Sequence, residues 1–175
     1  SRPCFFSEKS RRISGQEAVE QREYLKEMTV LLAEDDMIVR DSTAQALEIF
    51  VRRVIAVEDG IAALHQFYSG IADIVILDIK MPGKSGLEVA QEIRQSDDVT
   101  PIFIVSSFND CDQLHRAIPL LLIDYLIKPL NFAQLKMALI KSVDYLDKRG
   151  GLFKLSPLKG DRSEEHTSEL QSPNT

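Results

Sequence analysis

Chemically active side chains follow four short apolar segments of this sequence. Asp78 comes directly after the apolar run at residues 74–77, which is rich in β-branched side chains, and Met81-Pro82-Gly83 then forces the chain into a loop. The other groups are Glu34-Asp35-Asp36 after residues 30–33, Ser106-Ser107 after residues 102–105, and Lys128 after residues 122–127. Carboxylates, a hydroxyl and an ammonium group would together suit the binding of a divalent cation and a phosphoryl group.

The acidic residues by themselves indicate a metal site. Carboxylates that lie within a few ångströms of one another repel, so such a site favours a bound cation. A few protein oxygens, completed by water and a phosphoryl oxygen, are the ligands that Mg²⁺ prefers. In that setting Asp78 can act as a nucleophile toward an activated phosphoryl group, Lys128 can pair with the phosphate, and Ser106 can donate a hydrogen bond to it.

Each of these groups also has an ordinary structural explanation when it is taken alone. Asp78 and the acidic triplet at residues 34–36 could cap the helices that follow them. Ser106 could be a turn hydroxyl that bonds to its own backbone, and Lys128, next to Pro129, could be a solvated loop lysine. The functional interpretation rests on the coincidence of all four groups at equivalent positions in the chain.

The elements that would position these groups alternate along the chain from Thr29 onward. Apolar segments at residues 30–33, 54–57, 74–77, 102–105 and 122–127 predict five strands, each followed by apolar residues at helical spacing. Capping boxes at Ser85/Glu88 and Asn131/Gln134 predict helix starts, and a further helix is predicted at residues 110–118. Repeated βα units with short connections predict an α/β fold, a doubly wound parallel sheet whose strands deliver the four groups to one edge.

Composition is that of a water-soluble protein. The 175 residues include 44% hydrophobic and 27% charged residues, and the net charge of −6 argues against a nucleic-acid surface within them. Cys4 and Cys111 are too isolated for a disulfide framework or a zinc site, so free thiols are expected. No apolar run approaches the roughly 18 residues that a membrane span needs, and we expect a cytoplasmic location without membrane contact.

Four segments are distinguished along the chain. Residues 1–27 are interpreted as a leader, possibly helical from residue 16, and residues 28–148 as the α/β domain. Residues 149–161 are interpreted as a linker or as the start of a lost output domain, because their leucines and a phenylalanine have nothing local to pack against. Residues 162–175 look like the in-frame translation of a sequencing-library adapter and are excluded from the fold prediction.

Residues 28–148 resemble the receiver domains of bacterial two-component response regulators. The resemblance rests on Leu31-Leu32-Ala33-Glu34-Asp35-Asp36, Leu77-Asp78-Ile79-Lys80-Met81-Pro82 with Gly86, Pro101 to Ser106, and Asp124-Tyr125-Leu126-Ile127-Lys128-Pro129. It implies a five-stranded flavodoxin-like (βα)5 fold with strand order 2-1-3-4-5. It also implies a phosphorelay switch in which a histidine kinase or phosphotransfer protein phosphorylates Asp78.

The resemblance further implies a role for each site residue. The Mg²⁺ ligands would be Asp35 and Asp78 directly, Glu34 through water, and the backbone carbonyl of Lys80. Ser106 would be the switch hydroxyl, Tyr125 the switch aromatic residue, and Lys128 the phosphate-pairing lysine, with a cis peptide bond between Lys128 and Pro129. Asp36 falls one place beyond the acidic pair and is left out of the metal site.

The resemblance also implies that signalling follows from a rearrangement of the fourth helix, the fifth strand and the fifth helix of the receiver domain. By the same resemblance, that face would control an output domain or partner, with a possible homodimer through it when the domain is phosphorylated. DNA would be contacted only through a missing output domain. No enzyme activity is expected beyond self-phosphorylation and slow self-dephosphorylation.

One segment departs from the family pattern, and two other functions compete. Residues 118–122 replace the usual polar helix end and glycine, so Pro119 should shorten a helix and Leu120 or Leu121 should be exposed. A haloacid-dehalogenase-like phosphotransferase would place an aspartate where Lys80 stands. A receiver-like binding module that is not phosphorylated would typically lack one of the site residues, all of which are present here.

Overall fold

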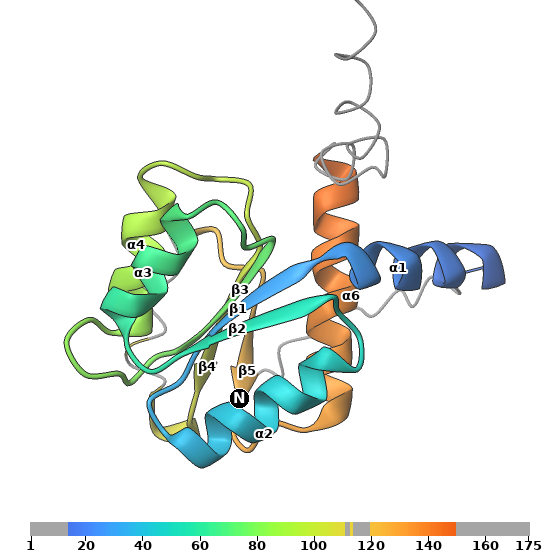
Figure 1. The fold of residues 1–175 in the computed structure, drawn as a ribbon. Coiled ribbons are helices and arrows are strands. Elements are labelled where there is room, and N and C mark those ends of the chain that lie inside the picture. The colour runs from blue at the N-terminus through green and yellow to red at the C-terminus, as the bar shows by residue number, and fades with distance from the viewer. Residues whose placement is uncertain (1–13, 111–112, 114–119, 150–175) are drawn as a thin grey trace, which may run out of the picture.

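A computed structural model describes residues 14–110, 113 and 120–149 of the chain (Figure 1). In chain order, its elements are α1 (Gly15–Glu27), β1 (Thr29–Ala33), α2 (Met37–Glu48), β2 (Arg53–Val57), α3 (Gly60–Tyr68), β3 (Ile74–Asp78), α4 (Gly86–Arg94), β4 (Ile102–Ser106), the short 3-10 helix η1 (Phe108–Asp110), β5 (Asp124–Ile127) and α6 (Phe132–Lys148). All strand pairs are parallel and the strand order is β2-β1-β3-β4-β5. The predicted doubly wound α/β fold is therefore confirmed.

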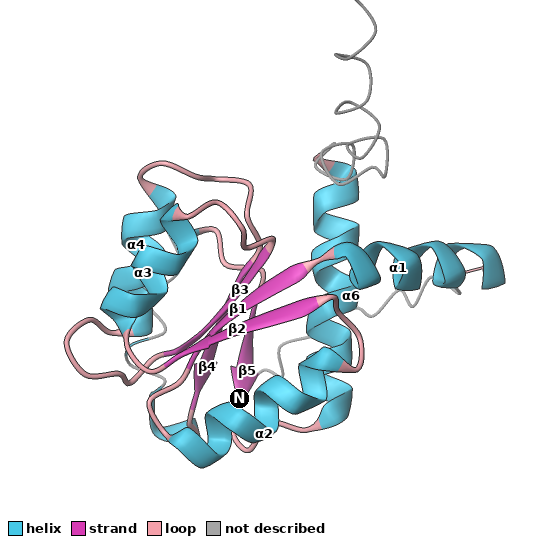
Figure 2. Ribbon diagram, viewed as in Figure 1, coloured by secondary structure: helices cyan, strands magenta, loops and turns pink. Residues whose placement is uncertain are grey.

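Helices cover both faces of the sheet, which Figure 2 shows by element type. The central strands β1, β3 and β4 are buried along their whole length, because alternate side chains enter two separate cores. Val30 and Leu32 pack on the face covered by α2 and α6, whereas Leu31 and Ala33 pack on the face covered by α3 and α4. This two-sided burial holds the strand ends, and with them the polar groups that follow, in fixed positions.

Helix starts agree with the capping signals in the sequence. The Ser85 hydroxyl accepts a hydrogen bond from the Glu88 amide at the start of α4, and the Glu88 carboxylate accepts one from the Ser85 amide. Asn131 and Gln134 make the same reciprocal pair at the start of α6. Both predicted capping boxes are confirmed, and the Lys128–Pro129 peptide bond is cis as expected.

The fifth strand begins later than predicted, at Asp124 instead of Leu122. The reason is a turn in front of it: Leu121 has a φ of 50°, which lies in the left-handed region. The Arg94 guanidinium holds this turn by donating hydrogen bonds to the carbonyls of Leu120, at 2.9 Å, and Leu121, at 3.3 Å. Leu120 is buried and Leu121 is 52% exposed, so the exposed leucine anticipated here is Leu121.

Leu121→Gly is expected to raise the free energy of unfolding by about 1 kcal/mol, because glycine avoids the steric cost of a Cβ in the left-handed region. Leu121→Ala removes the same exposed side chain but keeps the Cβ, so it should give no such gain. Urea unfolding of the two variants and the wild type measures the difference. Equal stability of the glycine and alanine variants would contradict the backbone explanation.

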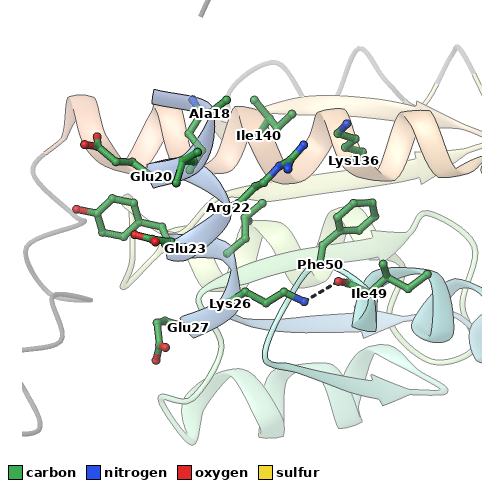
Figure 3. Close-up of a pocket in the computed structure, with 14 residues that line it drawn as sticks. Ala18, Glu20, Arg22, Glu23, Lys26, Glu27, Ile49, Phe50, Lys136 and Ile140 are labelled. Carbon is green, nitrogen blue, oxygen red and sulfur yellow. Dashed lines mark hydrogen bonds between the residues drawn. The ribbon is translucent and has the colours of Figure 1, made fainter. Parts of the chain in front are cut away.

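Helix α1, which confirms the helix thought possible from residue 16, packs against the helices that cover the sheet. Leu25 is buried in the same core as α2 and α6, and the Gln21 amide donates a 2.8 Å hydrogen bond to Asp144 on α6. The Lys26 ammonium donates a 2.6 Å hydrogen bond to the Ile49 carbonyl after α2. Between these helices lies an open groove of about 1020 Å³, whose lining includes no predicted site residue (Figure 3).

Several sequence-based expectations fall outside the described residues. They are nearly all of the helix at 110–118, the segment at 1–13, and the linker and adapter-like segments from residue 150 onward. The proposed segment boundaries stay predictions. Among the described residues, no helix is both long enough and apolar enough to cross a bilayer.

Candidate functional site

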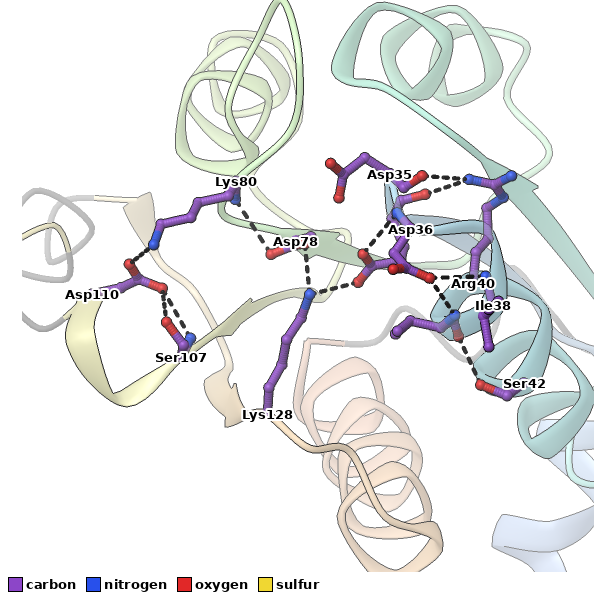
Figure 4. A network of polar contacts seen from close by, with 12 residues as sticks. Asp35, Asp36, Ile38, Arg40, Ser42, Asp78, Lys80, Ser107, Asp110 and Lys128 are labelled. Atoms are coloured by element: carbon purple, nitrogen blue, oxygen red, sulfur yellow. Dashed lines mark hydrogen bonds and ion pairs between the residues drawn. The ribbon is translucent and has the colours of Figure 1, made fainter.

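Asp35, Asp78, Lys80 and Lys128 lie together at the carboxyl edge of the sheet (Figure 4). Asp78 is the last residue of β3 and Ser106 is the last of β4, while Glu34 directly follows β1 and Lys128 directly follows β5. The strand registers pair Asp78 with Val105 and Ser106 with Ile127, so neighbouring strands end nearly level. The parallel arrangement therefore gathers groups that are up to 94 positions apart in the sequence, from Glu34 to Lys128.

Lys128 links the two buried carboxylates of the site. Its ammonium group donates a 2.7 Å hydrogen bond to Asp78 Oδ2 and lies 2.9 Å from Glu34 Oε2. Burial raises the pKa of Glu34, and the neighbouring Asp78 charge adds to this, although the Lys128 hydrogen bond acts in the opposite direction. Partial burial disfavours the charged form of Lys128, but hydrogen bonds to Asp78 and Glu34 outweigh it and raise the Lys128 pKa.

An acidic cluster opens to solvent beside this ion pair. Glu34, Asp35 and Asp78 each place a carboxylate oxygen within 4.8 Å of the others. Glu34 and Asp78 are buried whereas Asp35 is exposed, so a cation has access from one side. These carboxylates supply the kind of oxygen ligand that Mg²⁺ prefers, and a bound cation would offset their negative charge.

Asp36 has a different task. Its carboxylate caps α2 by accepting hydrogen bonds from the amides of Ile38, at 2.9 Å, and Val39, at 3.0 Å. The capping explanation considered for the acidic triplet is thus right for Asp36 alone. Its amide also donates to Glu34 Oε1 at 3.2 Å, which helps to orient the Glu34 carboxylate toward the site.

The remaining contacts of Asp78 come from the segment after β3. The Lys80 amide donates a 3.3 Å hydrogen bond to Asp78 Oδ1. Gly86 lies directly against the same residue, because a Cβ added there would come 2.3 Å from the Asp78 carbonyl oxygen. The side of Asp78 that faces this loop is therefore tightly packed backbone, and the role of the Lys80 carbonyl as a metal ligand stays a prediction.

Ser106 and Tyr125, to which the resemblance assigns switch roles, lie on neighbouring strands, Ser106 at the end of β4 and Tyr125 within β5. Ser106 is fully buried, and its Oγ has no hydrogen-bond partner within the described residues. A buried hydroxyl without a partner is costly, so it can gain energy from a new acceptor in the site. Tyr125 is half-buried on β5, and burial together with the nearby Asp124 charge raises the pKa of its hydroxyl.

Two features of the site were missed by the sequence analysis. The Arg40 guanidinium donates hydrogen bonds to the carbonyls of Glu34, at 2.8 Å, and Asp35, at 3.2 Å, and so holds the backbone of the acidic loop. The Lys80 ammonium lies 2.8 Å from Asp110 Oδ1. The spacing of Ser107 and Asp110 could have indicated a local side-chain turn, but no local signal pairs Asp110 with Lys80.

Asp110 is buried and ionised. Hydrogen bonds from Lys80 and from Ser107 lower the pKa of its carboxyl group to about 2. Ser107 contributes both its amide, at 2.9 Å, and its hydroxyl, at 2.7 Å, to Asp110 Oδ2. Lys80 therefore contacts Asp78 through its main chain and Asp110 through its side chain, as Figure 4 shows.

Comparisons with known proteins agree with this geometry. Residues 30–140 match the family model of the response regulator receiver domain. The transcriptional regulatory protein CiaR of Streptococcus pneumoniae is 34% identical over 124 residues, which cover 71% of this chain and 53% of CiaR. A cyclic di-GMP phosphodiesterase of Thermotoga maritima is 31% identical over 110 residues, covering 63% of this chain and 29% of that protein.

A solved structure shows the same fold. The crystal structure of a response regulator receiver domain protein from Clostridium thermocellum superposes with a TM-score of 0.66 at 23% identity, over 70% of this chain and 98% of that one. The present chain spans about half the length, or less, of the curated relatives it matches. The family match favours a receiver over the phosphotransferase alternative. The chain thus belongs to the response regulator receiver domain family and contains a phosphorylation-dependent signalling switch.

Proposed function

We propose that Asp78 is the phosphorylation site of this receiver domain and that a histidine kinase or a phosphotransfer protein supplies the phosphoryl group. The observation that carries the proposal is the position of Asp78: a buried carboxylate at a strand end, bonded to Lys128 and within 4.8 Å of two further carboxylates in the acidic cluster. A capping aspartate needs neither a lysine partner nor an acidic cluster. The combination is suited to phosphoryl transfer.

The chain's own groups account for the transfer. An Asp78 carboxylate oxygen attacks the phosphorus, the new O–P bond forms as the bond to the donor nitrogen breaks, and the leaving imidazole takes a proton from solvent. Lys128 is placed to exchange its bond to the Asp78 carboxylate for one to the incoming phosphoryl oxygens. Attack of water on the same acyl phosphate would restore Asp78 slowly.

We assign the Mg²⁺ site to Asp35 and Asp78 as direct ligands, with Glu34 acting through water and the Lys80 carbonyl completing the protein ligands. When bound, Mg²⁺ offsets the negative charge of the carboxylates and of the phosphoryl group. The proposal is supported by the acidic cluster and by the exposure of Asp35.

The switch is assigned to Ser106 and Tyr125. The Ser106 hydroxyl, which has no hydrogen-bond partner among the described residues, would move to donate a hydrogen bond to the phosphoryl group, and the Tyr125 ring would turn inward into the space released. Phosphorylation would act by shifting a population, because it stabilises only the conformation in which these contacts exist. The affected face would comprise β5, α6 and the helix predicted at residues 110–118, and it could support a homodimer of the phosphorylated form.

The output of the parent protein is inferred from the relatives. CiaR is named a transcriptional regulatory protein and is about twice as long as the matched region, whereas the Thermotoga maritima relative is named a phosphodiesterase. We propose that this receiver controls an attached output domain and that any DNA contact belongs to that domain. Support comes from the partial coverage of these relatives and from the acidic charge of the present chain.

Incubation of the protein with acetyl phosphate is expected to add one phosphoryl group when Mg²⁺ is present and none when EDTA is added. Intact-mass spectrometry measures uptake, and borohydride trapping of the acyl phosphate identifies the residue. Asp35→Asn should weaken Mg²⁺ binding by at least the roughly tenfold loss typical of removing a supporting group. The control Asp36→Asn makes the same change one residue away at a helix cap, where asparagine is equally suitable, and should bind Mg²⁺ normally. Uptake on another residue would overturn the assignment.

A further inference from the structure

The segments that follow β3 and β4 are joined across the site by one ion pair. The Lys80 ammonium lies 2.8 Å from Asp110 Oδ1, although the two residues are 30 positions apart. The Lys80 side chain is 63% exposed and points away from Asp78, whereas Asp110 is 2% exposed (Figure 4). An ion pair with one buried partner has more influence on conformation than a pair at the open surface.

Asp110 also binds Ser107, the residue that follows Ser106. Its second oxygen, Oδ2, accepts hydrogen bonds from both the amide and the hydroxyl of Ser107. Ser107 is covalently bonded to Ser106, whose buried hydroxyl has no partner in the described part of the chain. A continuous set of contacts therefore runs from Asp78 through Lys80, Asp110 and Ser107 back to Ser106.

This arrangement constrains the movement that phosphorylation requires. Asp78 Oδ1 accepts from the Lys80 amide and Oδ2 from Lys128, so Ser106 is not among its hydrogen-bond donors. A shift of the Ser106 backbone toward a phosphoryl group would carry Ser107 with it, because the two residues are adjacent. Such a shift would break the Ser107 bonds to Asp110 or carry Asp110 away from Lys80.

We propose that Lys80 and Asp110 are positioning residues that form a latch, which holds Ser106 in its unphosphorylated position and opposes the switch. The proposal rests on the proposed function, since it concerns the regulation of the same site. Its physical basis is that contacts present in only one of two conformations shift the equilibrium toward that conformation. Loss of the latch should therefore increase the fraction of molecules in which Ser106 can bind a phosphoryl group.

The test measures the affinity of the protein for beryllofluoride, a phosphoryl mimic, in the presence of Mg²⁺. Lys80→Gln and Asp110→Asn should each bind it about fivefold more tightly than the wild type, the low end of typical coupling between sites. The double variant should gain little more than either single one, because both remove the same ion pair. Lys80→Arg, which can keep the pair, should restore wild-type affinity.

Charge alone makes a different prediction, which separates the latch from simple electrostatics. Removing a cation near the site should weaken binding of an anion, and removing an anion should strengthen it. Tighter binding by Lys80→Gln is thus specific to the latch. The matched control is Lys84→Gln, which removes an equal charge in the same loop but breaks only the pair between Lys84 and Glu92. It should not gain affinity.

A second measurement keeps the latch testable if the protein binds no beryllofluoride. In the unliganded protein the Ser107 amide should exchange with solvent faster in Lys80→Gln than in the wild type, since its acceptor Asp110 loses an anchor. Absence of binding by the wild type would count against the proposed function, and the latch would then be judged on this exchange rate. Unchanged or weaker affinity of Lys80→Gln, or unchanged exchange, would overturn the latch.

Discussion

Asp78→Asn is expected to abolish phosphate uptake from acetyl phosphate while the protein stays folded. Asparagine keeps an oxygen that can accept the hydrogen bond from Lys128, so the local packing should survive. It lacks the nucleophilic carboxylate, and the acidic cluster loses one of its three charges, so both phosphoryl transfer and Mg²⁺ binding are lost together. Intact-mass spectrometry after incubation measures the uptake.

The matched control for this variant is Asp73→Asn, immediately before the other end of β3. The Asp73 carboxylate accepts a 2.8 Å hydrogen bond from the Thr29 amide and lies far from the acidic cluster along the strand. The Asp73→Asn protein should therefore take up phosphate on Asp78 to the same extent as the wild type. A folded Asp78→Asn protein that still becomes labelled at the wild-type rate would exclude Asp78 as the acceptor.

Gly86→Ala is expected to lower the free energy of unfolding by about 3 kcal/mol, at the upper end of the cost of overpacking a core. The added Cβ would lie 2.3 Å from the carbonyl oxygen and 2.9 Å from the carbonyl carbon of Asp78. Both atoms belong to the backbone at the end of a buried strand, which cannot rotate away as a side chain could. Urea unfolding measures the loss, and slower phosphate uptake should accompany it because Asp78 is displaced.

Gly15→Ala provides an unusually close control. Gly15 and Gly86 each open a helix directly after a serine cap, and both helices have a capping box. A Cβ at Gly15 meets nothing within 4 Å, so alanine there should be neutral or should stabilise the helix by up to about 1 kcal/mol. If the two variants lost equal stability, helix propensity and not the contact with Asp78 would explain the Gly86 effect.

Local sequence patterns were sufficient for the architecture because they report properties that act over a few residues. Alternation of apolar strands and helices, together with capping boxes at Ser85 and Asn131, predicted the five strands and the helices that follow β1, β2, β3 and β5. Failures occurred where a distant residue decides the backbone. The start of β5 was misplaced because Arg94 binds the carbonyls of Leu120 and Leu121 from another helix and holds the turn there.

In the acidic triplet at residues 34–36, too, local sequence was insufficient and a contact in the folded chain decided the role of each residue. Sequence proximity could not assign different tasks to Asp35 and Asp36, and only the resemblance to a family separated them. In the folded chain the distinction is physical: the start of α2 uses Asp36 as its cap, which leaves Asp35 with Glu34 and Asp78 at the strand edge. The helix end therefore selects which carboxylate is available for a cation.

The sequence by itself determined that Asp78, the acidic pair at residues 34–35, Ser106 and Lys128 share one edge, because parallel strands with right-handed connections end on the same side. Only the tertiary structure decided which of these groups touch. The bonds of Lys128 to Asp78 and Glu34, the close approach of Gly86, and the ion pair between Lys80 and Asp110 all depend on angles and distances between elements. Such distances are fixed by the packing of two cores, which no local pattern encodes.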